Sequence, residues 1–238
     1  MLTGSQDDST SGELWWAVEA RMAMSAARDA ILRNVRRALG RDRGAPVAPL
    51  PATARVGPRA AGERDAEIDL LLGEIDKLGG VTRRLAGGDE LAGALQQLVR
   101  AEGVRKATLW PAEELRELGV ADTLAALGVD MVSAQAGRRQ LAECDLGITG
   151  ADAALPETGT LLLRSSPERP RLVSLLPRVH LAIIRPAALR ADLHQALADV
   201  KGEGYCVFVT GPSRTADIEL TLTVGVHGPK ALYAWVLG

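Results

Sequence analysis

Cysteine is scarce in this sequence, and its scarcity excludes several kinds of site. The two cysteines, Cys144 and Cys206, lie far apart and in largely apolar surroundings. Two isolated thiols cannot form a paired zinc-binding motif or supply the four ligands of an iron-sulfur cluster. Their surroundings are typical of reduced thiols in a protein core, so we expect no disulfide, no metal site and no cluster in this chain.

An excess of one charge and long apolar runs are also missing. The chain has 28 Lys and Arg against 30 Asp and Glu, so no global field draws it to nucleic acid or to an anionic membrane. No apolar run reaches the roughly 18 residues that a membrane-spanning helix needs. The opening "MLTGSQDDSTSGELWW" lacks the basic and apolar regions of a signal peptide, so we expect a cytoplasmic protein.

The common nucleotide and metal motifs do not occur either. Neither G-x-G-x-x-G after a strand nor G-x-x-x-x-G-K-[ST] is present, which removes the main sequence support for NAD or ATP binding. The histidines His180, His194 and His227 are too scattered to predict a metal site. His194 falls in a predicted helix, where we expect it at or near the surface.

Composition and periodicity predict one large domain behind an N-terminal region. With 47% apolar residues, the 238-residue chain can bury a substantial core. Residues 1–23 follow no periodic pattern and are predicted to be a flexible extension. Residues 24–40 are predicted to form a helix, residues 41–62 a linker rich in proline and glycine, and residues 63–238 the main domain. The apolar side of the predicted helix consists of Ile31, Leu32, Val35 and Leu39.

Helix and strand signals alternate in the first half of the main domain. The strands "VTRRLA", "KATLW" and "VDMVSA" are separated by the helices "ELAGALQQLVRAEG", which Asp89 can cap, and "AEELRELG", which Pro111 can open. From residue 145 the runs "LGITGADAALPETGTLLLRSS", "RLVSLLP" and "VHLAIIRP" are rich in strand formers, and a helix over 187–201 and a strand over 205–210 follow. This order predicts an α/β fold, a mostly parallel sheet flanked by helices with a β-rich portion.

The segment "TGPSRTADIE" is the strongest candidate for a binding site. It follows the strand "YCVFV", and we expect a helix to begin within "TADIELTLTVG". The turn between them would lie at the carboxyl edge of the sheet, where the free N–H groups of a helix N-terminus join Ser213, Arg214 and Thr215 in binding an anion. Asp217 and Glu219 would orient Arg214 or stabilise the helix start. The alternative is that Ser213 or Thr215 only caps the helix.

Two further residues are candidates for catalysis. His227 stands in the tight turn "GVHGPK", which can direct an imidazole into a cleft, and Glu157 stands in "LPETGTLLL", where Gly159 allows close backbone approach. In both cases the alternative is a structural turn. A triad of Ser213, His227 and Asp217 has little support because the flanks are not G-x-S-x-G.

These clusters, together with "RLVSLLPRVHLAII" and the opening "ARDAILRNVRRALG", resemble the lactate-utilisation protein C family, the LUD-domain proteins. The resemblance spans about residues 24–238. It implies a fold related to the ribose-5-phosphate isomerase, glucosamine-phosphate isomerase and CoA-transferase group. It also implies a place in a cytoplasmic system that oxidises L-lactate to pyruvate, with iron-sulfur clusters in partner subunits.

We therefore expect an accessory, non-redox subunit of lactate oxidation that carries an organic-anion site and binds no cofactor of its own. One alternative is a free-standing enzyme acting on a small carboxylate or sugar phosphate, and another is a structural or regulatory scaffold.

Overall fold

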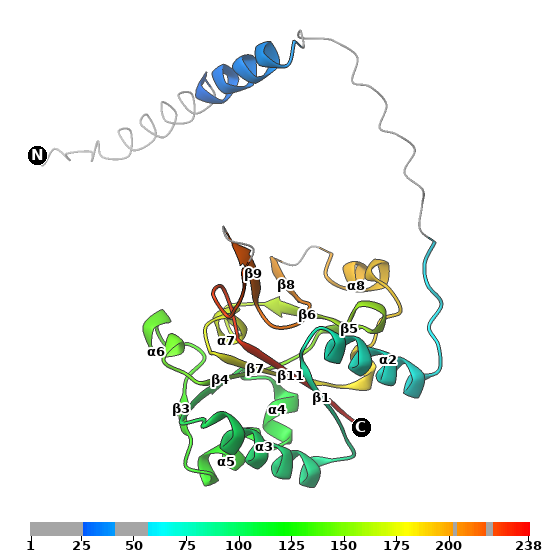
Figure 1. Ribbon diagram of the computed structural model, residues 1–238, viewed down its shortest axis with the longest axis vertical. Coiled ribbons are helices and arrows are strands. Elements are labelled where there is room, and N and C mark those ends of the chain that lie inside the picture. Colours follow the sequence, from blue (N-terminus) through cyan, green and yellow to red (C-terminus); the bar gives the residue numbers. More distant parts are fainter. Residues whose placement is uncertain (1–25, 41–56, 202–203, 218–220) are drawn as a thin grey trace, which may run out of the picture. The chain divides into compact units, whose positions relative to one another are not determined.

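The computed structural model describes residues 26–40, 57–201, 204–217 and 221–238 (Figure 1). Of residues 215–217 and 221–224 it describes the backbone only. The chain divides into two compact units, Met1–Arg55 and Val56–Gly238. Residues 1–23 lie outside the described part of the first unit. The second unit contains every strand that the structure describes.

The first unit contains a helix over residues 26–38, where the sequence predicts one over 24–40. Ile31, Val35 and Leu39 recur every four positions and so lie along one side of the helix. Their exposed fractions are 62%, 48% and 60%. Nothing within residues 26–40 buries this apolar side.

The second unit is built on a six-stranded sheet in which all neighbouring strands are parallel (Figure 1). The strand order is β1-β11-β7-β4-β2-β3. The strands are β1 (Val81–Leu85), β2 (Lys106–Leu109), β3 (Asp130–Val132), β4 (Leu146–Gly150), β7 (Val179–Ile184) and β11 (Ala231–Leu237). The predicted α/β fold with a mostly parallel sheet is thereby confirmed.

Helices cover both faces of this sheet. They are α2 (Arg64–Lys77), α3 (Gly88–Glu102), α4 (Glu113–Glu117), α5 (Val120–Ala126) and α6 (Arg138–Ala142). Helix α2 buries Ile68, Leu71 and Ile75 against one face, while Leu95 of α3 and Leu124 of α5 are buried in the core on the other. Because β4 and β7 are covered on both faces, every one of their residues is buried.

The position of β2 fixes where a ligand can approach the sheet. After β2 the chain moves outward to β3, and it then returns to the other side of β2 as β4. The direction of the strand order therefore reverses beside β2. In open α/β sheets such a reversal opens a crevice at the carboxyl ends of the strands.

A second, antiparallel sheet forms the predicted β-rich portion. Its strands β5 (Ala153–Leu155), β6 (Thr160–Ser165) and β8 (Tyr205–Val209) are arranged in the order β5-β6-β8. A 3-10 turn, Pro156–Thr158, joins β5 to β6, and α8 (Leu193–Asp199) packs on β5. Both sheets belong to the same unit.

The helix predicted within residues 215–225 is wrong. The structure has an antiparallel hairpin there, formed by β9 (Arg214–Asp217) and β10 (Thr221–Val224). The sequence "TADIELTLTV" alternates polar and apolar residues strictly, a period of two that is typical of a strand. This alternation outweighs the Thr, Asp and Glu residues that suggested a helix start.

Three smaller predictions also fail. The run "RLVSLLP" contains a short helix, α7 (Leu172–Leu175), and no strand. Gly87 is the N-cap of α3, and Asp89 lies in its first turn. The helix expected over 187–201 begins only at Leu193 because Pro186–Ala188 forms a separate 3-10 turn, and the side chain of Asp192 caps it by accepting from the N–H of Gln195.

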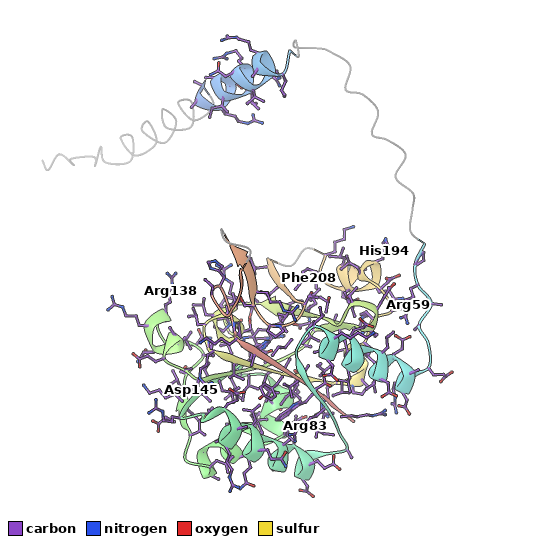
Figure 2. All side chains as sticks on the ribbon, viewed as in Figure 1. Arg59, Arg83, Arg138, Asp145, His194 and Phe208 are labelled. Carbon is purple, nitrogen blue, oxygen red and sulfur yellow. The ribbon has the colours of Figure 1, made fainter. Side chains whose placement is uncertain are left out.

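The packed part of the second unit begins before the predicted domain start at Glu63. Arg59, labelled in Figure 2, makes several hydrogen bonds to the rest of the unit. Its guanidinium donates to both carboxylate oxygens of Glu67, at 2.7 and 2.9 Å, and its backbone N–H donates to Asp192 Oδ2 at 2.7 Å. The N–H of Gly62 also donates to Glu67. These bonds fasten residues 59–62 to α2 and to the start of α8.

Candidate functional site

The predicted turn around Ser213 lies beside the antiparallel sheet, away from the carboxyl edge of the parallel one. It follows β8 and leads into the β9–β10 hairpin, so no helix N-terminus supplies free N–H groups to it. The N–H of Ser213 donates to the carbonyl of Pro229 at 3.0 Å, and its carbonyl accepts from Gly225 at 2.9 Å. These bonds hold Ser213 against the turn that carries His227.

Ser213 and His227 line one small cavity of about 140 Å³. That volume is below the roughly 300 Å³ at which ligand pockets usually begin. His180 of β7 also lines it, and its Nε2 lies 2.9 Å from Thr149 Oγ1 in a buried hydrogen bond. Burial lowers the pKa of His180 to about 4, so its imidazole is neutral at neutral pH. Among the described residues, no Lys or Arg lines this cavity.

Other predicted site residues lie away from this cavity. A guanidinium nitrogen of Arg214 lies 3.2 Å from the position that a Cβ atom of Gly79 would take, just beyond the end of α2. A positive charge at the C-terminus of a helix interacts favourably with the helix dipole. Neither Arg214 nor Glu157 lines the cavity. The side chains of Thr215 and Asp217 are not described, and Glu219 lies outside the described residues. Anion binding by Ser213, Arg214 and Thr215 stays a prediction.

Glu157 is exposed on the 3-10 turn that joins β5 to β6. The close backbone approach expected at Gly159 is present, since a Cβ there would lie 2.8 Å from the backbone nitrogen of Ile75 on α2. Glu157 also acts electrostatically on Arg59. The turn therefore packs on α2, and the structure does not bring Glu157 to His227.

A larger cleft of about 600 Å³ opens at the carboxyl edge of the parallel sheet, where the strand order reverses. Segments that follow three neighbouring strands meet in it. Its lining consists of Ala112, Glu113 and Glu114 after β2, Ala151 and Asp152 after β4, Arg185, Ala187 and Ala188 after β7, and Arg164 and Arg169 from β6 and the loop behind it. None of the residues that line this cleft was singled out from the sequence.

Asp152 is the anchor of this cleft. Its side chain is only 7% exposed. It accepts from the backbone N–H of Arg164 at 2.7 Å, from Nε of the same arginine at 3.1 Å and from Nη2 of Arg169 at 2.8 Å. One buried carboxylate therefore fixes two guanidinium groups at the edge of the sheet.

An aromatic ring completes the support of Arg169. Its guanidinium carbon lies 4.3 Å from the centre of the Trp110 ring, in cation–π contact. Trp110 is fully buried, and its indole N–H donates to the carbonyl of Pro170 at 2.9 Å. Arg169 is thus held between Trp110 and Asp152 and forms a rigid wall of the cleft.

Comparison with known proteins gives the family. The model of the LUD domain matches residues 74–237, about two-thirds of the chain. The chain belongs to the LUD domain family. A relative named "Lactate utilization protein C" from Shouchella clausii is 34% identical over 221 residues, which cover 87% of this chain and 96% of that protein. One of the same name from Halalkalibacterium halodurans is 34% identical over 157 residues, which cover 61% of this chain and 68% of that protein.

A solved structure supports the fold of this LUD protein. A duf162 family protein from Deinococcus radiodurans matches with a TM-score of 0.56 and 21% identity, covering 75% of this chain and all of that one. The predicted family resemblance is confirmed by the match to the LUD domain model and by the relatives named lactate utilization protein C. The likeness to the isomerase and CoA-transferase group stays a prediction.

Charged side chains at the two edges of the LUD sheet differ in whether they have partners. At the amino edge, Arg178 donates to Asp145 at 3.2 Å and to the carboxylate of Glu102 at 3.0 Å. At the carboxyl edge, no hydrogen-bond or ion-pair partner of the Arg185 or Glu114 side chain is found in the part of the chain that the structure describes. The carboxyl-edge cleft therefore has a cation and an anion available for a ligand.

A wider hollow of about 800 Å³ adjoins this cleft and shares Ala112 and Glu113 with it. It runs between α4, α5 and the end of β3. Its charged groups are few, and Glu113 is already paired with Arg116 of the same helix. The smaller cleft is therefore lined by more charged side chains than the wider hollow.

Metal and membrane signals are weak in the described residues. No group of three or more His, Cys, Asp or Glu side chains in them is arranged to hold a metal ion. None of their helices is both long and apolar enough to cross a membrane.

Proposed function

We propose that this LUD protein takes part in lactate utilisation as a subunit that holds a small organic anion and carries no redox centre of its own. The lactate role rests on its likeness to proteins named lactate utilization protein C, one of which it matches over 96% of that protein's length. The single observation that carries the anion site is the cleft at the carboxyl edge. There Asp152 anchors two arginines beside Arg185, which has no partner among the described residues.

Electron transfer is assigned to partners because of the cysteines. Oxidation of lactate to pyruvate releases two electrons and two protons, which an acceptor must take up. Cys144 and Cys206 cannot supply the four ligands of a cluster, and burial raises the pKa of the Cys144 thiol, which keeps it protonated and unreactive. We therefore propose iron-sulfur partner proteins as the electron acceptors.

Copurification and growth test this function together. A tagged chain expressed in its own organism, grown on L-lactate, should copurify with cysteine-rich proteins that contain stoichiometric iron, identified by mass spectrometry and metal analysis. Deletion of its gene should stop growth on L-lactate and spare growth on pyruvate. Unimpaired growth of the deletion strain on L-lactate would refute the proposed role.

One observation favours the alternative of a free-standing enzyme. Glu114 places an unpaired carboxylate in the cleft, where it can serve as a general base. The purified chain should then convert a small carboxylate or sugar phosphate alone. Assays of L-lactate with an artificial electron acceptor separate the two functions, since only the enzyme would reduce the acceptor without partners.

A further inference from the structure

Arg185 is the first of two charged side chains in the cleft that have no partner among the described residues. It follows β7 directly, its backbone is extended, and it is half-buried. Its neighbours in the cleft, Arg164 and Arg169, are both bound to Asp152. Its own guanidinium has no hydrogen-bond or ion-pair partner within the described residues. A half-buried guanidinium with free donors is suited to hold a carboxylate with two bonds.

Glu114 is the second charged side chain of the cleft that has no partner among the described residues. It is half-buried on α4, and a Cβ atom at Gly150 would overlap its Oε1 atom. Glycine at the end of β4 therefore leaves the space that this carboxylate occupies. Like Arg185, the carboxylate has no partner within the described residues. An unpaired carboxylate in a half-buried site is costly unless a donor reaches it.

The sheet register brings the two groups together. Gly150 of β4 is paired with Ile183 of β7, and Arg185 lies two positions beyond Ile183. Residues two apart on an extended strand point to the same face. Arg185 therefore emerges on the face that carries Ile183, beside the strand end against which Glu114 packs, and both line the same cleft.

A ligand that satisfies both groups must carry an anionic group and a hydrogen-bond donor close to each other. A plain carboxylate would satisfy Arg185 but would meet repulsion from Glu114. We propose that this cleft binds a small 2-hydroxycarboxylate, with the ligand's carboxylate on Arg185 and its hydroxyl donating to Glu114. A 2-amino acid offers similar chemistry, and the preference for the hydroxyl rests on the proposed function.

The wall formed by Asp152, Arg169 and Trp110 fits this assignment. Because Arg169 is already bound to Asp152 and stacked on Trp110, it contributes positive potential without competing for the ligand's carboxylate. The keto acid formed on oxidation has no hydroxyl, so it loses the bond to Glu114 and gains repulsion between its carbonyl oxygen and that carboxylate. The cleft therefore favours release of the oxidised product.

Calorimetric titration of the full chain tests the ligand class without any assay of activity. The ligands are L-lactate, propionate, pyruvate and L-alanine, which differ only at the second carbon. L-lactate should bind about tenfold or more tightly than propionate or pyruvate, the usual effect of one hydrogen bond to a charged group. Equal binding of L-lactate and propionate, no binding of L-lactate, or tighter binding of L-alanine would each overturn the proposal.

Two variants and a control locate the site. Arg185→Gln should weaken L-lactate binding about tenfold or more. Glu114→Gln should bring L-lactate and pyruvate binding closer together, because an amide can donate to a keto oxygen as well as accept from a hydroxyl. Arg138→Gln, on the exposed surface of α6, should bind as wild type does (Figure 2). Wild-type binding by Arg185→Gln would overturn the assignment.

The binding experiments can fail without the proposed lactate role failing, and the reverse is also possible. The ligand series on the unmodified chain needs no variant to fold, and thermal melts show whether each variant is intact. If the chain copurifies with iron-sulfur proteins but does not distinguish L-lactate from propionate, this inference falls and the lactate role stands. If it distinguishes them but the deletion strain grows on L-lactate, the reverse holds.

Discussion

At the scale of single residues, His180 is the most unusual side chain in the sheet. It stands in the fully buried strand β7, and its only side-chain hydrogen bond among the described residues is to Thr149 on the neighbouring strand. Its register partner on β4 is Gly147. A histidine inside an apolar run, as in "VHLAII", indicates a buried polar side chain that needs a hydrogen-bond partner.

The lowered pKa of His180 predicts an acid-sensitive fold. Burial lowers this pKa to about 4, so between about pH 6.5 and pH 4 the unfolded chain takes up a proton that the folded chain does not. The effect of His180 on the free energy of unfolding should therefore be absent above about pH 6.5. It should lower that free energy by about 3 kcal/mol as the pH falls to 4. Urea unfolding of wild type and His180→Gln at several pH values should give a flatter pH dependence for the variant. Parallel curves would contradict this.

Two glycines should respond to the same substitution in opposite ways. A Cβ atom at Gly147 would overlap the carbonyl oxygen of Val173, so α7 packs directly on this position of β4. Gly147→Ala should lower the free energy of unfolding by about 1 to 3 kcal/mol, as overpacking does. Gly73→Ala is the control, since nothing lies within 4 Å of a Cβ at that position of α2. It should stabilise by about 0.5 to 1 kcal/mol. Chemical unfolding of both variants tests these two expectations. If the Gly147→Ala variant is as stable as wild type, α7 can move away from β4.

At the scale of elements, the bonds of Glu67 determine how the start of the second unit is fastened. Glu67 is 6% exposed on α2 and accepts from Arg59 and Gly62. The hydrogen bond from Arg59 is the main reason why its pKa lies below the usual carboxyl value. The contribution to stability is therefore present at neutral pH and is lost as the pH falls through this lowered pKa.

Replacing Glu67 should loosen residues 59–62. Glu67→Gln should reduce the free energy of unfolding at pH 7 by about 1 to 3 kcal/mol, because charge-assisted bonds become ordinary ones. The difference from wild type should shrink as the pH falls below the ordinary glutamate pKa of about 4.3, because the unfolded chain then takes up a proton at Glu67 more readily than the folded chain does. Glu74→Gln removes a more exposed pair with Lys77 on the same helix and should change stability by less than about 1 kcal/mol. Equal effects of the two variants in chemical unfolding would show that Arg59 is not an anchor.

The elements that the sequence predicted correctly are those with a strong local pattern. Strands β1, β2, β3 and β7 are short runs of strand-forming residues between turn residues, and their order with the helices specified a mostly parallel sheet. The β9–β10 hairpin was mistaken for a helix because capping residues were given more weight than strict alternation. Local pattern alone also could not say that β8 pairs with β6 in a separate sheet, and this error placed the turn at Ser213 on the wrong edge.

The cleft residues escaped prediction for a different reason. Glu114, Asp152 and Arg185 come from three separate crossovers, and only the order of strands brings them to one place. Each alone is an ordinary charged residue after a strand. By contrast, Ser213 and His227 flank the two strands of the β9–β10 hairpin, so the pairing of those strands brings them together.

At the scale of the whole molecule, the second unit contains its own core. All buried apolar side chains in the described residues fall between Ile68 and Leu237. Removal of residues 1–55 should therefore change the thermal midpoint by less than about 5 °C. Differential scanning calorimetry of the full chain and of residues 56–238 checks this. A larger decrease would mean that the first unit contributes to the stability of the second.

The place of β11 in the sheet has a consequence for how this protein is made. Strand β11 is the last in the sequence, yet it lies between β1, the first, and β7, with Val81 paired to Tyr233 and Ala231 to Val179 (Figure 1). Almost the whole domain must leave the ribosome before β1 has any neighbour in the sheet. Pairing over so long a stretch is slow to form, and until it forms β1 and β7 remain open edges to which other chains can add. A chain that stops before Ala231 would therefore be aggregation-prone and would have a divided sheet.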